Sequence, residues 1–120
     1  MDRADFSSEM YVAVIEQSFL FELPLGVTDV MRDGTRVPHG PWAPSDCSAV
    51  MIAWFDRDWI FLHRSPGDDT PVPRAYARDV LLDPARWKQE NAEGCFALMP
   101  TASAPDDYRD WLSAVPTSIE

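Results

Sequence analysis

The stretch AVMIAWFDRDWIFLHR, residues 49–64, places two strongly apolar runs on either side of the charged group at residues 56–58. If Arg57-Asp58 forms a two-residue loop, Trp54 faces Phe61 and apolar side chains occupy both faces of the two strands. Strands that are apolar on both faces are typical of the centre of a covered sheet. The stretch therefore predicts a central β-hairpin, with Trp54 and Phe61 in the core.

Upstream of this stretch, Met10 to Leu23 is rich in β-branched and aromatic residues. This composition favours two strands with a turn near Gln17-Ser18. A helix that begins at Ser7 or Ser8 is the alternative, because several residues after these serines are compatible with helix.

The next segment predicts a second hairpin followed by an exposed loop. Val27–Met31 leads into Asp33-Gly34, which is a turn signal. Residues 36–46 hold three prolines and are expected to run extended and unpaired on the surface. Trp42 in this loop either folds back onto the core, which we favour because Trp buries a large apolar area, or anchors a contact.

The C-terminal half has clearer signals for the ends of its elements. Residues 65–73 form a second Pro-rich loop with Asp68 and Asp69 near its tip. A helix is expected over residues 84–92, because Asp83 can cap it and a proline suits its first position. Residues 95–99 are expected to form a strand that Pro100 ends.

The last helix has the most regular pattern in the chain. Asp106 and Asp107 fall in its first turn, where carboxylates favour the helix dipole. Apolar residues follow at helical spacing, namely Tyr108, Trp111, Leu112 and Val115. Together these elements predict a single globular domain over residues 1–120, of the α+β class, with a single antiparallel sheet and two or three helices packed on it.

The chain is strongly acidic, with a net charge of −10 among 120 residues. Such a surface repels phosphate backbones and anionic lipids, so we expect no direct nucleic-acid or membrane binding. The N-terminus lacks the layout of a secretory signal and no apolar run approaches bilayer-spanning length, so we expect a cytoplasmic protein. Nine of the ten basic residues are Arg, which suggests a GC-rich, bacterial genome.

The candidate catalytic and metal-binding residues show no familiar spacing. Cys47 and Cys95 look like structural thiols rather than nucleophiles, and together with His39 and His63 they are too scattered for a zinc site. His63 as a general base is the enzymatic alternative. The predicted hairpin places His63 far from Asp56 and Asp58 at the turn, so Asp68 or Asp69 would have to serve as its orienting carboxylate. We predict no cofactor and no metal.

These observations favour a small acidic protein-binding module. A toxin-neutralising immunity protein or an inhibitor that blocks a basic partner, such as a toxin domain, fits the size, the charge and the rigid loops. We predict that the partner surface is acidic. Its expected residues are Asp106, Asp107, Asp110, Asp68, Asp69 and Trp42. The alternative is a small enzyme with a histidine-centred hydrolase or isomerase site.

Overall fold

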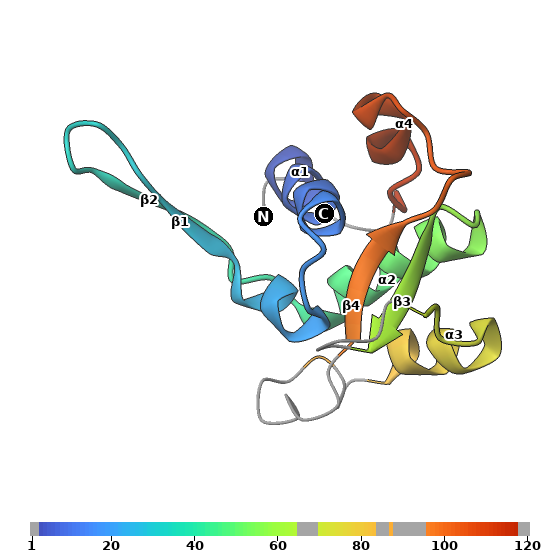
Figure 1. Ribbon diagram of the computed structural model, residues 1–120. Coiled ribbons are helices and arrows are strands. Elements are labelled where there is room, and N and C mark those ends of the chain that lie inside the picture. The colour runs from blue at the N-terminus through green and yellow to red at the C-terminus, as the bar shows by residue number, and fades with distance from the viewer. Residues whose placement is uncertain (1–2, 65–69, 84–86, 88–95, 118–120) are drawn as a thin grey trace.

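The structure, a computed structural model, describes residues 3–64, 70–83, 87 and 96–117. Its elements form a body of helices around one pair of strands, with a second pair of strands projecting from the body (Figure 1). In chain order they are α1 (Arg3–Ile15), the 3-10 helix η1 (Leu20–Leu25), β1 (Val27–Val30), β2 (Arg36–His39), α2 (Pro44–Asp56), β3 (Ile60–Arg64), α3 (Arg74–Leu82), β4 (Phe96–Pro100) and α4 (Tyr108–Ser113).

Helix α2 corrects the hairpin predicted at residues 49–64. Only the second apolar run is a strand, β3, whereas the first is the C-terminal part of α2. Helical spacing explains the difference, because the buried positions follow the i, i+3, i+4, i+7, i+8 pattern from Cys47 onward. They are Cys47, Val50, Met51, Trp54 and Phe55. Pro44 at the start of the helix completes the signal.

The charged group at residues 56–58 ends α2 and reverses the chain into β3. Asp58 adopts a left-handed conformation, with φ of 63°, and its backbone N–H donates to Phe55 O at 2.9 Å. Arg74 from α3 supports this end of the helix: its guanidinium donates to Phe55 O and to Asp58 Oδ1, both at 2.9 Å. The predicted charged tip is therefore a helix-to-strand turn.

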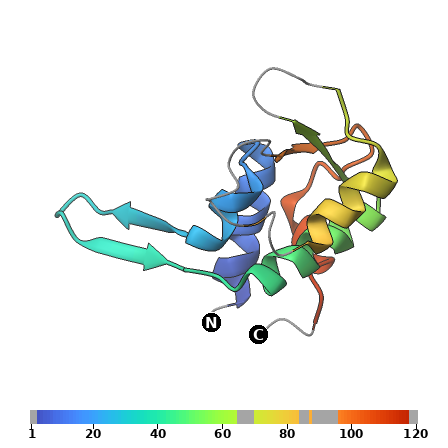
Figure 2. The same cartoon turned by 90° about the horizontal axis from the view of Figure 1, so that it is seen from below.

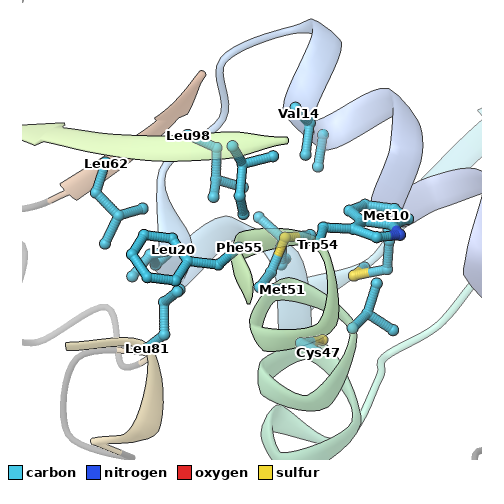
Figure 3. Packing of buried hydrophobic residues seen from close by; sticks show 14 of the residues in the cluster. Met10, Val14, Leu20, Cys47, Met51, Trp54, Phe55, Leu62, Leu81 and Leu98 are labelled. Atoms are coloured by element: carbon cyan, nitrogen blue, oxygen red, sulfur yellow. The ribbon is translucent and has the colours of Figure 1, made fainter. Parts of the chain in front are cut away.

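Strand β3 pairs with β4 in antiparallel register, with Leu62 opposite Leu98. Figure 3 shows both leucines on the side of the sheet that faces α2, with Leu62 next to Phe55, so this side of the sheet covers the core. Trp54 is fully buried as predicted, but Phe61 on the other side of β3 is only partly buried. The strand predicted to end at Pro100 is confirmed as β4.

The N-terminal segment is helical, so the two strands predicted over Met10–Leu23 are wrong. Helix α1 covers Arg3–Ile15 and the chain turns at Gln17, which has a positive φ of 57°. The helix alternative holds, although α1 begins before Ser7. Burial of Phe6, Met10 and Val14 on one side of α1 outweighs the strand propensity of the β-branched residues.

The hairpin predicted around Asp33-Gly34 is confirmed as β1 and β2, which pair with Val30 opposite Arg36. Residues 36–39 are thus paired rather than unpaired, as part of this hairpin. We call residues 27–39 the arm, because they project away from the rest of the molecule in both views (Figures 1 and 2). At its base, a Cβ on Gly26 would lie 2.1 Å from His39 O, and one on Gly40 would lie 3.0 Å from Gly26 Cα.

The fold is α+β as predicted, but the single sheet is wrong. Two separate two-stranded antiparallel sheets take its place, β1–β2 in the arm and β3–β4 in the body.

Helix α3 was not predicted, whereas α4 was, with Asp107 as its N-cap rather than in its first turn. The loop tip at Asp68 and Asp69 lies outside the described residues. The helix predicted over 84–92 also lies outside them, except for Trp87. Among the described residues, no helix has both the length and the apolar character needed to cross a bilayer.

Candidate functional site

An open pocket of about 380 Å³ lies at the base of the arm, where α1, η1 and β1 meet. Four carboxylates line it: Glu9, Glu16, Glu22 and Asp29. No Lys or Arg is among its lining residues, all of which are described. We call this feature the acidic pocket, and its charge makes it a site for cationic groups.

Apolar side chains complete the pocket, among them Val12, Leu25 and Val27, which are exposed. Trp42 also lines it and is only 8% exposed, with its ring 5.2 Å from that of Phe6 in an edge-to-face contact. The prediction that Trp42 folds back onto the core is confirmed. Its indole Nε1 has no hydrogen-bond partner among the described residues. A mixed acidic and apolar lining suits a ligand with both cationic and aliphatic parts.

His39 connects the arm to α1 beside this pocket. Its Nδ1 lies 2.7 Å from Asp5 Oδ1 and its Nε2 lies 2.9 Å from Asp29 Oδ2. A histidine donates from both ring nitrogens only when it is protonated. The hydrogen bond to Asp5 is the main reason why the pKa of His39 is raised, and the Asp29 carboxylate adds to it. When protonated, His39 donates to both carboxylates and links Asp5 to Asp29.

Glu9 shows how strongly negative this region is. Burial raises the pKa of Glu9, and the nearby carboxylates of Asp5, Asp29 and Glu16 raise it further, while the positive charge of His39 opposes them. Acidic groups that raise one another's pKa are stabilised by any cation that comes between them. The pocket therefore favours binding of positive charge.

A set of metal-ligand types also occurs here. Asp5, Glu9 and His39 each offer one ligand atom, and these atoms lie within 4.8 Å of one another. Sequence reasoning missed this set because it weighed His39 only with His63 and the cysteines, and carboxylates only as adjacent pairs. A metal ion would have to replace the Asp5–His39 hydrogen bond, since both nitrogens of His39 already contact carboxylates. The present arrangement is that of an ion-pair network.

The predicted acidic residues of α4 lie apart from this pocket. Asp107 accepts from the backbone N–H of Arg109 at 2.9 Å and pairs with the Arg109 guanidinium at 2.9 Å. Arg109 lowers the pKa of the Asp107 carboxyl, as expected for a helix-capping ion pair. Asp106 and Asp110 are exposed. The structure thus does not bring these aspartates into one pocket with Trp42, and it does not describe Asp68 and Asp69.

The structure describes His63 but not Asp68 or Asp69, so the carboxylates expected to orient it lie outside the described residues. His63 is buried on β3, opposite Ala97 of β4. The two carboxylates at the predicted turn are held elsewhere, since Asp56 pairs with Arg78 at 3.2 Å and Asp58 pairs with Arg74 at 2.9 Å. Neither Asp56 nor Asp58 therefore orients His63.

Cys47 fits the structural interpretation made from the sequence. It is fully buried on α2, and burial with the neighbouring Asp46 raises the pKa of its thiol to about 12. Because the thiolate is the nucleophile, such a thiol is unreactive near neutral pH. Cys95 lies outside the described residues.

The cluster of Asp5, Glu9 and His39 was missed because no helix was assigned before Ser7 from the sequence. Once the segment is helical, Asp5 and Glu9 stand at i and i+4 and share one side of α1. That spacing was visible in the sequence. The contact with His39 was not, because it depends on how the arm leaves η1. No family model matches the chain, and neither a curated protein nor a solved structure matches it, so the function has to be inferred from the pocket and the arm.

Proposed function

We propose that this protein is a small acidic protein-binding module that binds a basic protein partner and blocks it. The acidic pocket is the observation that carries the proposal, because four carboxylates line it without a Lys or Arg among them. A toxin-neutralising immunity protein is the biological role that fits this chemistry best. The net charge of −10 supports the same partner class, since it accelerates encounter with a basic surface.

The pocket supports a peptide-like contact rather than a small anion or a nucleic acid. Its exposed apolar residues, Val12, Leu25 and Val27, stand beside the carboxylates. An arginine or lysine side chain presents a cationic head on an aliphatic stem, which matches both parts of this lining. The partner surface is therefore expected to combine basic and aliphatic side chains.

The aspartates at α4 form a second acidic surface to which a basic partner could bind. Asp106 and Asp110 are exposed, whereas Asp107 is engaged by Arg109. We rank the pocket first because it is concave and its carboxylates have no basic neighbour in the lining, so they gain more from an incoming cation.

Binding of a labelled peptide with alternating arginine and leucine residues tests the proposal. Removing two of the four pocket charges by Glu9→Gln with Glu16→Gln is expected to lower the affinity about 2- to 30-fold, because each exposed charge pair contributes roughly 0.2–1 kcal/mol. Fluorescence anisotropy measures the affinity, and added salt is expected to weaken it.

The matched control is Asp106→Asn with Asp110→Asn, which removes the same charge from α4. It is expected to leave binding nearly unchanged. A loss with the control and none with the pocket variant would move the partner surface to α4. A peptide in which glutamates replace the arginines and that binds equally well would exclude charge recognition altogether.

A further inference from the structure

Beyond its base, where His39 contacts Asp5 of α1, the arm projects from the body without entering the core. Its residues 27–38 are all exposed, and none of them belongs to the core cluster. Two-stranded hairpins are marginally stable alone in water and are normally stabilised by further strands or by packing. A projecting arm of this kind therefore has surface available for another chain.

The arm also exposes apolar side chains that the body does not cover. Val27, Val30, Met31 and Val37 are between 37% and 63% exposed. They are distributed along the length of the arm. Apolar residues that gather on one projecting element, rather than singly over a surface, indicate a contact with another molecule.

The two outer edges of the arm differ in their ability to pair. Pro38 lies within β2, and a proline in a ladder is found with its nitrogen facing outward, so the outer edge of β2 lacks a donor there. The outer edge of β1, with the sequence VTDV, contains no proline. The β1 edge is therefore the one open to a further strand.

The charges at the two ends of the arm are complementary. Arg32 and Arg36 lie at its tip, while the acidic pocket lies at its base. Asp33 also lies at the tip, where its carboxylate accepts from Thr35 N at 2.9 Å, so the two arginines exceed it by one positive charge. When a strand pairs antiparallel with its own copy, the tip end of one lies beside the base end of the other.

We propose that two copies of this chain form a symmetric dimer by pairing their β1 edges antiparallel. Arg32 and Arg36 of each copy then lie against the acidic pocket of the other. The interface is self-complementary, so each favourable charge contact occurs twice. Val27 and Val30 of each β1 gain cross-strand neighbours in the same step.

The dimer goes beyond the proposed function but uses the same pocket. A basic partner therefore competes with the arm tip of the second copy, and binding of the partner is expected to dissociate the dimer. The dimer can form whether or not the protein has a basic partner. The two proposals can for this reason fail separately.

Sedimentation equilibrium over a range of concentrations tests the dimer. The tip variant Arg32→Glu with Arg36→Glu is expected to weaken self-association at least about tenfold, because every reversed contact counts twice. The pocket variant Glu16→Lys with Glu22→Lys is expected to do the same. Thermal melts establish that both variants are folded.

The decisive measurement mixes the two variants. In a mixed dimer the basic tips of the pocket variant meet an unchanged acidic pocket, and the acidic tips of the tip variant meet a pocket whose two introduced lysines have cancelled its negative charge. Self-association is therefore expected to be stronger in the mixture than in either variant alone, as a heterodimer. Wild-type protein that stays monomeric up to millimolar concentration, or a mixture that stays monomeric, would overturn the proposal. Peptide binding to a monomeric wild type would leave the proposed function standing without the dimer.

A second variant tests the paired edge itself. Thr28→Pro removes a donor from the outer edge of β1, just as Pro38 does on β2. The dimer is expected to be lost while the body stays folded. A dimer that survives Thr28→Pro would show that the arms meet through side chains rather than through β1, and would overturn the proposed pairing.

Discussion

His39 stands between two carboxylates that come from different elements. Asp5 belongs to α1 and Asp29 to β1, and His39 itself belongs to β2. Protonation of one side chain thus ties the arm to the body and β1 to β2. A raised pKa in the folded state means that folding favours the protonated form. The link is fully formed below the ordinary histidine pKa of about 6.5 and is lost as pH rises through the raised pKa of the folded state.

Nuclear magnetic resonance titration of His39 checks this. We expect its pKa to lie above that of an ordinary histidine, and we expect Asp5→Asn to bring it down, because the hydrogen bond to Asp5 is the main cause of the shift. As pH rises through the pKa of His39, amide hydrogen exchange at the base of the arm is expected to accelerate. The acceleration should exceed the increase that intrinsic exchange rates show with pH. A titration unchanged by Asp5→Asn would mean that the Asp5–His39 contact does not form in solution.

At the scale of elements, the two sides of β3 differ. Leu62 is fully buried against α2, whereas Phe61 on the opposite side is partly buried. Leu62→Ala is expected to cost about 2–5 kcal/mol of the free energy of unfolding, since it leaves a cavity in the core. Phe61→Ala is expected to lower the free energy of unfolding by less. The central hairpin predicted from the sequence would have implied a loss of about 3–5 kcal/mol for this substitution.

Urea denaturation of the two variants measures this difference. Leu98→Ala, the cross-strand neighbour of Leu62, is a matched control that should resemble Leu62→Ala. If Phe61→Ala is the most destabilising of the three variants, then the side of β3 that carries Phe61, and not the side that carries Leu62, faces the core.

The sequence allowed prediction of elements whose signals are local. The arm follows from Asp33-Gly34, β4 from its ending at Pro100, and α4 from the spacing of Tyr108, Trp111 and Val115. Residues 49–56 were predicted as a strand because short apolar runs fit either a strand or a buried helix, and the window began after Pro44 and Cys47. The acidic pocket could not be predicted, because Glu9, Glu22 and Asp29 meet only through the path of the chain from α1 to β1.

At the scale of the whole molecule, the body and the arm have different sources of stability. The body is held by a core that includes Trp111, whose ring lies 5.0 Å from that of Trp54 and whose carbonyl accepts from Trp54 Nε1. The arm contributes no residue to this core. Regions with few buried apolar contacts open locally at a lower free energy than the core.

Replacement of residues 27–39 by a short Gly-Ser linker tests this division. The body is expected to keep a single cooperative unfolding transition, with an m-value only slightly below that of the full chain, because the arm buries little surface. Circular dichroism during urea titration measures it. A shortened protein that loses its cooperative transition would show that the arm is part of the folding unit.

The close approach at the base of the arm limits how its length can vary. Gly26 and Gly40 leave no room for a Cβ, so the base is fixed, whereas a Cβ on Gly34 at the tip would meet nothing within 4 Å. Insertions are therefore tolerated toward the tip. One extra residue in each strand would turn Arg32 and Arg36 to the opposite side, because side chains alternate along a strand. Two extra residues in each strand restore their direction, so working arms of different lengths should differ in steps of about four residues.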